Sequence, residues 1–322
     1  MTMTRTPPVP SRSGTAPSQA APSPDRRLRN RMRRREQRAG WLMAAPALIL
    51  LGLFLLLPTV LGFLLSFTDA RLVSPNAPRF IGLDNFSRAL FDDSVLHRST
   101  VNTLYFAAVV VPLHSALALV LALLVNTRMR GTTLLRTVYF LPVVTSIVAI
   151  SVVWRFMYAE DGLVNSMLST FSGSILQGSD WLAHSGTAMP AVMLMSIWQA
   201  VGFHMIIWLA GLQAIPEYLY EAATLDGAGT WQKFRHVTWP GLRPTLILVV
   251  VTETIGALGV FIQINVMTHG GPVDSTSTII FQTFQQGVKQ QDIGYASAIS
   301  LLFFVLVLAI SLGQGAWSRR KA

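Results

Sequence analysis

The sequence predicts an all-α integral membrane protein with six transmembrane helices. Of its 322 residues, 52% are hydrophobic and 12% are charged, whereas soluble domains carry about a quarter charged residues. The apolar residues gather in runs close to the ~20 residues that a helix needs to cross about 30 Å of hydrocarbon. Basic residues concentrate on one side of these runs, which gives the helices a direction. Cysteine is absent, which excludes disulfides, thiolate metal sites and a cysteine nucleophile.

The N-terminal residues 1–40 are predicted to form a disordered, Arg-rich cytoplasmic tail. The tail begins with Pro, Ser, Thr and Ala and holds almost no large apolar side chains, so it cannot bury enough surface to fold. Eight arginines follow between Arg26 and Arg38. A basic block beside an apolar run favours membrane orientation over nucleic-acid binding, because such blocks stay on the cytoplasmic side. We therefore expect no nucleic-acid partner, despite the net charge of +10.

Six apolar stretches are the predicted membrane spans, and together they form a transmembrane domain over residues 41–314. Pro46, Pro58, Pro112 and Pro142 lie within the runs, and they do not exclude spanning because neighbouring helices can satisfy the freed backbone groups. The first run is too long for a cleaved signal peptide and follows a long tail, so we expect a retained helix. The predicted spans are residues 41–67, 101–125, 138–154, 188–212, 246–267 and 293–312.

The basic residues predict the topology of these spans. Seventeen lie in the N-terminal block, the loops after the second and fourth spans, and the basic tail 315–322, against six on the opposite side. Positive residues are retained in the cytoplasm during insertion. We therefore expect both termini and the loop between the fourth and fifth spans, residues 213–244, to be cytoplasmic.

The 213–244 loop is predicted to contain two short helices joined by a tight turn. Pro216 suits the first helical position, and Glu221 is one of two acids near the positive helix end. Gly227 supplies the backbone freedom for the turn, and Pro240 is expected to end the second helix. Small side chains around the turn would let a partner approach closely. A solvated connector between two spans is the alternative reading of the same residues.

The order of residues in this loop resembles the EAA loop of binding-protein-dependent ABC importer permeases. The family pattern has Glu-Ala-Ala, a glycine four positions later, and an apolar residue, one free position and Leu-Pro further on. In this sequence Val237 replaces the usual isoleucine and Trp239 the leucine, and both changes exchange one apolar side chain for another. The matching positions are Glu221, Ala222, Ala223, Gly227, Val237, Trp239 and Pro240.

Further stretches are similar to the sugar-importer permeases in order and spacing, across nearly the whole folded chain. They include "WLMAAPALILLGLFLLLPTVLGFLLSFTD", "LLVNTRMRGTTLLRTVYFLPVVTS" and "VMTHGGPVDSTST". The "MTHGGP" stretch resembles the first subunit type of a heterodimeric pair, related to maltose and glycerol-3-phosphate permeases. The resemblance implies a multi-pass permease of the bacterial inner membrane, which moves a sugar or sugar-like solute from an external binding protein into the cytoplasm.

The resemblance also implies the partners and the roles of the loop residues. The expected partners are a second homologous permease, two cytoplasmic ATPase subunits, an external solute-binding lipoprotein and membrane lipid. The EAA loop is then the coupling helix, with Glu221 as the charged contact to the ATPase, Ala222 and Ala223 allowing close approach, and Gly227 making the turn. Asp226 is a weaker candidate for the same surface.

Nucleotide is expected on the partner, so the chain itself needs no cofactor and is not an enzyme. A Walker A motif requires a Gly-Lys pair. The three lysines, Lys233, Lys289 and Lys321, follow glutamine, valine and arginine. ATP and Mg²⁺ would therefore be bound by the ATPase chain.

Candidates for a solute path lie in the fourth and fifth spans. Glu253 is an ionisable residue inside a span, where it is expected to face the bundle interior or a water-filled cavity. It is either an acceptor for sugar hydroxyls or a buried structural partner. Trp198 and Gln199 could supply a stacking ring and an amide, while Gln263 and Asn265 stand about 80° and 120° from Glu253 on an ideal helix.

Other ionisable residues are expected to be structural. His114 and His204 are predicted to pack or to form hydrogen bonds, and no metal site is predicted because no metal-ligand spacing is present. An ion-gradient-driven secondary transporter is the alternative function. That class normally shows repeated halves and ionisable residues in several spans, and neither is visible in the sequence. A membrane enzyme would need a nucleophile, metal cluster or carboxylate pair, none of which is found.

Overall fold

The regular structure is helical throughout the part of the chain that the computed structural model describes, which confirms the predicted all-α class. The described residues contain no β-strand, only two isolated bridges. The chain divides into two compact units, Met1–Thr59 and Val60–Ala322. The structure describes residues 26–126, 131–172 and 180–321.

The first unit contains α1 (Arg26–Leu51) and the π-helical turn η1 (Gly52–Leu56). The Arg-rich block at the start of α1 is therefore helical. The first 25 residues of the predicted tail lie outside the described residues. The apolar part of this helix begins at Ala39.

Five helical stretches in the described ranges are long and apolar enough to cross a membrane, and the count is six if one bent pair of helices is a single span. Each of the five coincides with a predicted span to within a few residues, except that the second begins seven residues earlier than predicted, at Ser94. The prolines within them are accommodated, as predicted. The five stretches are Ala39–Leu65, Ser94–Val125, Ala188–Gln213, Arg243–Met267 and Ile293–Ala316.

The third predicted span, 138–154, is not one straight helix. The structure has α5 (Thr132–Val144) and α6 (Ile147–Met157), and their apolar parts meet at an angle of 97°. Thr145 and Ser146 between them have extended backbone, with ψ of 145° and 124°. Hydrophobicity alone predicts a continuous run here, because the two extended residues are too few to interrupt it.

Two prolines are preceded by a widened helical turn. In both cases the residue before the proline donates its N–H to a carbonyl five positions back, Leu57 to Gly52 and Trp239 to Phe234. A proline clashes with the carbonyl four residues earlier in a regular α-helix, and a π-helical turn relieves that contact. The helix therefore continues to Gly241, one residue past Pro240. The prediction that Pro240 stops the second loop helix was wrong for this reason.

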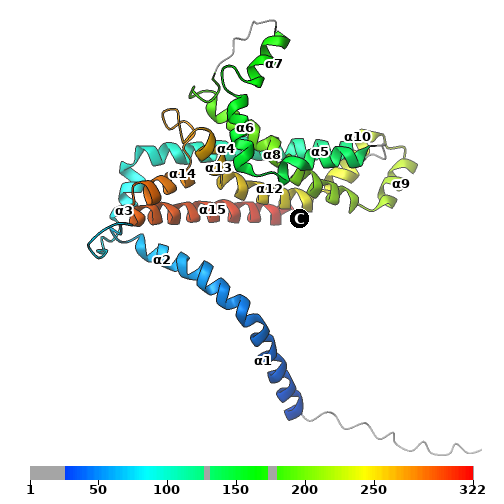
Figure 1. Cartoon of the computed structure of the whole chain (residues 1–322). Helices are drawn as coiled ribbons and strands as arrows, with labels where there is room; N and C mark the ends of the chain where they lie inside the picture. Colours follow the sequence, from blue (N-terminus) through cyan, green and yellow to red (C-terminus); the bar gives the residue numbers. More distant parts are fainter. Residues whose placement is uncertain (1–25, 127–130, 173–179, 322) are drawn as a thin grey trace, which may run out of the picture. The chain divides into compact units, whose positions relative to one another are not determined.

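The second unit is built around α4 (Ser94–Val125), α8 (Ala188–Gln213) and α12 (Arg243–Leu258), which pack against one another. Figure 1 shows these helices and α15 (Ile293–Lys321) running in roughly the same direction, with α6 turned away. Their contact surfaces form the buried core, which includes Phe106, Leu121, Met195, Trp208 and Val249.

Glycine at position 202 permits the closest approach in this core. A Cβ atom at Gly202 of α8 would overlap the carbonyl oxygen of Tyr139 in α5. The absence of a side chain at Gly202 therefore lets α5 and α8 approach closely.

Short helices connect and cover the long ones. The segment between α13 and α14 contains the "GGP" stretch and is fixed to α4, where Asn102 donates to the carbonyl oxygens of Asp274 (2.8 Å) and Ser277 (3.0 Å). The remaining elements of the second unit outside the 213–244 loop are α2 (Leu57–Leu65, which begins in the first unit), α3 (Asp84–Ser87), η2 (Arg88–Asp92), α7 (Leu163–Ser172), α13 (Ile262–Met267), α14 (Ile279–Phe284) and η4 (Gln285–Lys289).

Candidate functional site

The 213–244 loop folds into the two short helices that its local chemistry predicts. The first is α9 (Glu217–Leu225), preceded by Pro216 with extended backbone. The second begins with α10 (Thr230–Lys233) and continues through η3 (Phe234–Thr238) to α11 (Trp239–Gly241). Gly227 lies between them with a φ of 76°. This left-handed conformation is the one that glycine adopts without strain, so the predicted role of Gly227 in the turn is confirmed.

The two loop helices are tied together at their bases. The hydroxyl groups of Tyr220 in α9 and Thr238 in η3 are 3.0 Å apart and share a hydrogen bond. Gln232 accepts the N–H of Gly229 at 2.8 Å, which caps the start of α10. The Tyr220–Thr238 contact joins the two helices, whereas the Gly229–Gln232 bond caps the second helix beside the turn.

The tip of the loop presents small and acidic residues at the surface. Glu221, Ala222 and Asp226 are exposed, and Ala223 is half-buried. Between the helices lies a hollow of about 450 Å³, lined by Ala222, Ala223, Asp226 and Gly227 among others. Leu225 at the end of α9 is 89% exposed.

Three of the five predicted path residues line one cavity inside the second unit. Gln199, Glu253 and Gln263 contribute to a cavity of about 220 Å³ between α4, α8 and α12. Trp198 and Asn265 do not line this cavity. Trp198 instead packs on Trp154 of α6, with ring centroids 5.4 Å apart.

A break in the fifth span explains why Gln263 reaches the cavity. Helix α12 ends at Leu258, and α13 begins at Ile262 after a turn at Gly259. The angle expected between Glu253 and Gln263 assumes an unbroken helix, so it does not apply across this break. Sequence periodicity could not place these two residues together.

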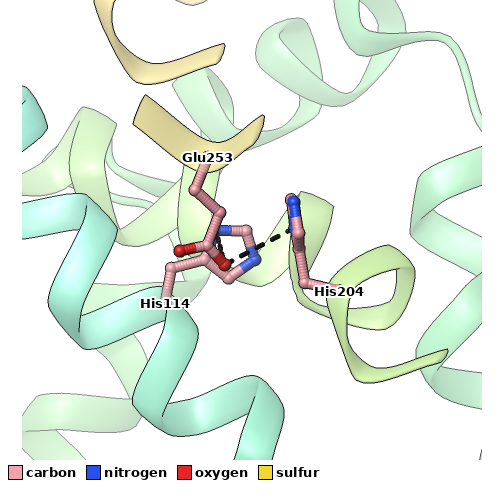
Figure 2. A group of neighbouring side chains, drawn as sticks. All are labelled: His114, His204 and Glu253. Carbon is pink, nitrogen blue, oxygen red and sulfur yellow. Dashed lines mark ion pairs between the residues drawn. The ribbon is translucent and has the colours of Figure 1, made fainter. Parts of the chain in front are cut away.

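The cavity wall also holds a cluster of three ionisable side chains, shown in Figure 2. His114 comes from α4, His204 from α8 and Glu253 from α12. Oε1 of Glu253 lies 3.8 Å from Nδ1 of His114 and 3.7 Å from Nδ1 of His204. The residues are buried, with exposed fractions of 4%, 8% and 4% for His114, His204 and Glu253. We call these residues the three-helix cluster.

Five of the six side-chain polar atoms of the three-helix cluster are buried without a hydrogen-bond partner among the described residues. Nε2 of His114, both ring nitrogens of His204 and both carboxyl oxygens of Glu253 are buried without a partner. The prediction that His114 and His204 pack or form hydrogen bonds is confirmed as to packing. The rings do pack edge to face, with centroids 4.8 Å apart.

Sequence reasoning missed the three-helix cluster because its members are far apart in the chain. Metal or polar sites within one helix show a short spacing such as i, i+4, whereas this cluster takes one residue from each of three helices. A usable signal was present, since His114 and His204 are ionisable residues inside apolar spans, which are functional-site candidates by default.

Comparison with known proteins identifies a family for residues 103–322, which match the model described as the binding-protein-dependent transport system inner membrane component. The chain is 36% identical over 289 residues to the trehalose/maltose transport system permease protein MalF of Thermococcus litoralis, covering 89% of this chain and 96% of that protein. It is 34% identical to the lactose transport system permease protein LacF of Rhizobium radiobacter, covering 85% and 92%.

Solved structures agree with these relatives. The fold matches a chain of a bacterial ABC transporter involved in the import of the acidic polysaccharide alginate, with a TM-score of 0.77 and 27% identity. The match covers 91% of this chain and 99% of that one. A second alginate transporter structure, in complex with an alginate pentasaccharide-bound periplasmic protein, matches with a TM-score of 0.77 and 26% identity, over 89% and 96% of the chains.

Proposed function

The chain belongs to the family of binding-protein-dependent transport system inner membrane components, and from that premise we propose that it is the permease subunit of an ATP-driven importer for a sugar or sugar-like solute. The observation that carries this proposal is similarity over almost the full length to permeases named for trehalose, maltose and lactose. The apolar helices make it a multi-pass protein of the inner membrane.

In this proposal the 213–244 loop is the coupling element. Both termini and the loop lie in the cytoplasm, where seventeen basic residues are concentrated. The exposed tip with Glu221, Ala222 and Asp226 enters a cleft of a cytoplasmic ATPase subunit. The rigid base of the loop supports this role, because a tied pair of helices can transmit movement to α8 and α12.

The chain acts within a larger assembly. A second permease, two ATPase subunits that bind ATP and Mg²⁺, and an external solute-binding lipoprotein complete the importer. Exposed apolar side chains on α4, such as Leu113, Leu117 and Val120, suit lipid or the second permease. The periplasmic protein bound in the alginate transporter structure supports an external partner.

The solute path is proposed to run past the cavity that Gln199, Glu253 and Gln263 line. Amide and carboxyl groups provide the donors and acceptors that sugar hydroxyls need. Trp198 and Asn265 lie outside this cavity, so any part they play would be elsewhere on the path.

Gene deletion and rescue test the proposed function in the cell. A strain lacking this chain should lose accumulation of the labelled sugar that its binding protein recognises, and the intact gene should restore it. A matched strain lacking the binding protein should show the same loss, because the importer needs both. Undiminished accumulation in the deletion strain, with other uptake systems for that sugar removed, would reject the assignment.

A further inference from the structure

The three-helix cluster contains the ligand types of a transition-metal site. His114, His204 and Glu253 each offer one ligand atom, and these atoms lie within 4.8 Å of one another. Two imidazoles and one carboxylate form a common set of protein ligands for zinc when a further position is filled by water or another ligand. Mg²⁺ and Ca²⁺ prefer oxygen ligands, so the two imidazoles favour Zn²⁺ or a similar late transition metal.

The distances between the side chains favour a shared metal ion over a direct hydrogen bond or a bridging water. The two imidazole-to-carboxylate separations are 3.7 and 3.8 Å. A direct charge-assisted hydrogen bond needs about 2.8 Å, and a single bridging water at tetrahedral angles holds its partners about 4.6 Å apart. Two ligands on one Zn²⁺, each at about 2.1 Å, are separated by roughly 3.4 to 3.6 Å. The observed values are closest to the last case.

The electrostatics of the site lead to the same ligand. Both oxygens of Glu253 are buried and unpartnered, and the described residues that line the cavity include no lysine or arginine to balance a carboxylate. A buried carboxyl group is stable when it is protonated, paired with a cation or bound to a metal, and a buried unpaired charge is costly. A divalent cation would satisfy Glu253 and the free ring nitrogens together.

The cavity supplies access and room for the remaining ligands. Its volume of about 220 Å³ is several times the ~30 Å³ that a water molecule occupies. The side chains of Gln199, Thr252 and Gln263 line the same space.

We propose that His114, His204 and Glu253 form a binding site for Zn²⁺ that joins α4, α8 and α12. The two imidazole-to-carboxylate separations are slightly longer than in a closed tetrahedral site, and the cluster's ligand atoms span up to 4.8 Å, so binding requires the three helices to move together at this point. A bound ion is then a cross-link within the helix bundle, and it opposes any movement of α4, α8 and α12 relative to one another.

Direct measurement of bound zinc tests the site. The complete importer, purified in lipid nanodiscs without a polyhistidine tag, is dialysed against micromolar Zn²⁺ and its metal content is measured by mass spectrometry. We expect His204→Gln and Glu253→Gln each to remove one Zn²⁺ per copy of this chain, with affinity at least about tenfold weaker, since even outer-sphere partners change affinity by 10- to 100-fold. The matched control His184→Gln removes an exposed imidazole outside the cluster and should keep the full zinc content.

Cobalt provides an independent readout. Co²⁺ in a four-coordinate site absorbs visible light strongly, and Glu253→Gln should lose that band while His184→Gln keeps it. Equal zinc content in the wild-type and both cluster variants would overturn the proposal, as would equal loss in the His184→Gln control. Zinc is measured directly, so its failure to bind would leave the importer assignment unchanged.

Discussion

The side chains at the tip of the 213–244 loop are exposed to solvent. The carboxyl groups of Glu221 and Asp226 belong to exposed residues, and neither takes part in a salt bridge among the described residues. The charge of either side chain can therefore be reversed with little effect on folding, because surface substitutions away from special features usually change the free energy of unfolding by less than about 0.5 kcal/mol. A loss of function from such a change would point to a partner.

Glu221→Lys tests that contact. We expect the variant to reach near-normal levels in the membrane but to lose transport and to co-purify less ATPase. Replacing a charge-assisted contact by repulsion costs roughly 2 kcal/mol or more, which is about 30-fold in affinity. The control is Glu160→Lys, which makes the same charge change at an exposed position outside the loop. Normal uptake by Glu221→Lys would leave the loop as a connector.

Gly227→Val tests the turn rather than the contact. The native φ of 76° is strained for a β-branched residue by about 1 to 3 kcal/mol. We expect the two loop helices to be misaligned and transport to fall, with normal insertion of the spans. Gly229→Ala is the matched control, because Gly229 has an ordinary φ of −71° and the nearest atom to a Cβ there is 3.8 Å away. The test measures uptake and the amount of protein in the membrane for both variants. Equal transport by the two would contradict this role of Gly227.

At the scale of the elements, local chemistry and long-range packing differ in how well the sequence predicts them. The loop helices and their turn were predicted because Pro216, the acids of α9 and Gly227 act on their own neighbours. The spans were predicted because their hydrophobicity is continuous. The bend of 97° between α5 and α6, the π-helical turn before Pro240 and the break after Leu258 were not, because each depends on a few backbone angles.

The candidate site divides in the same way. The exposed residues of the loop lie together because they are close in the sequence. The cavity residues come from α4, α8, α12 and α13, so their meeting depends on how these helices pack, and no spacing in the sequence encodes it. The sequence identified Glu253 but not its neighbours, the two imidazoles.

Gly202→Ala tests the crossing of α5 and α8. The added Cβ would overlap the carbonyl oxygen of Tyr139, and such overpacking costs about 1 to 3 kcal/mol. We expect a lower melting temperature of the purified complex, measured by the loss of its monodisperse elution after heating. Gly62→Ala, a helical glycine with no atom within 4 Å of the new Cβ, is the control and should melt normally. Equal melting of both variants would show that the close approach is not needed.

At the scale of the whole molecule, the assignment requires a defined topology. Cysteine accessibility or reporter tags at Thr230 should report the cytoplasm, while tags at Asp92 and Asp274 should report the outside, since the distribution of basic residues predicts a cytoplasmic 213–244 loop. An external Thr230 would contradict coupling to a cytoplasmic ATPase. A cytoplasmic Asp92 would overturn the proposed number or direction of the spans.

The proposed importer also requires that ATP binding and solute passage belong to different chains. In the proposed importer we expect nucleotide to bind the partner ATPase, because this sequence does not contain the Gly-Lys pair of a P-loop. In that proposal, energy from ATP reaches the solute path through the contacts of the ATPase subunits with the two permeases, including this chain. A secondary transporter would instead need an ion gradient and no partner.

Uptake by the reconstituted importer distinguishes an ATP-driven importer from a secondary transporter most directly. The complex of both permeases and the ATPase, in proteoliposomes with the binding protein and labelled sugar outside, is assayed with ATP inside and with all ion gradients collapsed by ionophores. We predict accumulation that requires both ATP and the binding protein and that is absent when this chain is omitted. Accumulation driven by an ion gradient without ATP, or unchanged accumulation without this chain, would contradict the account.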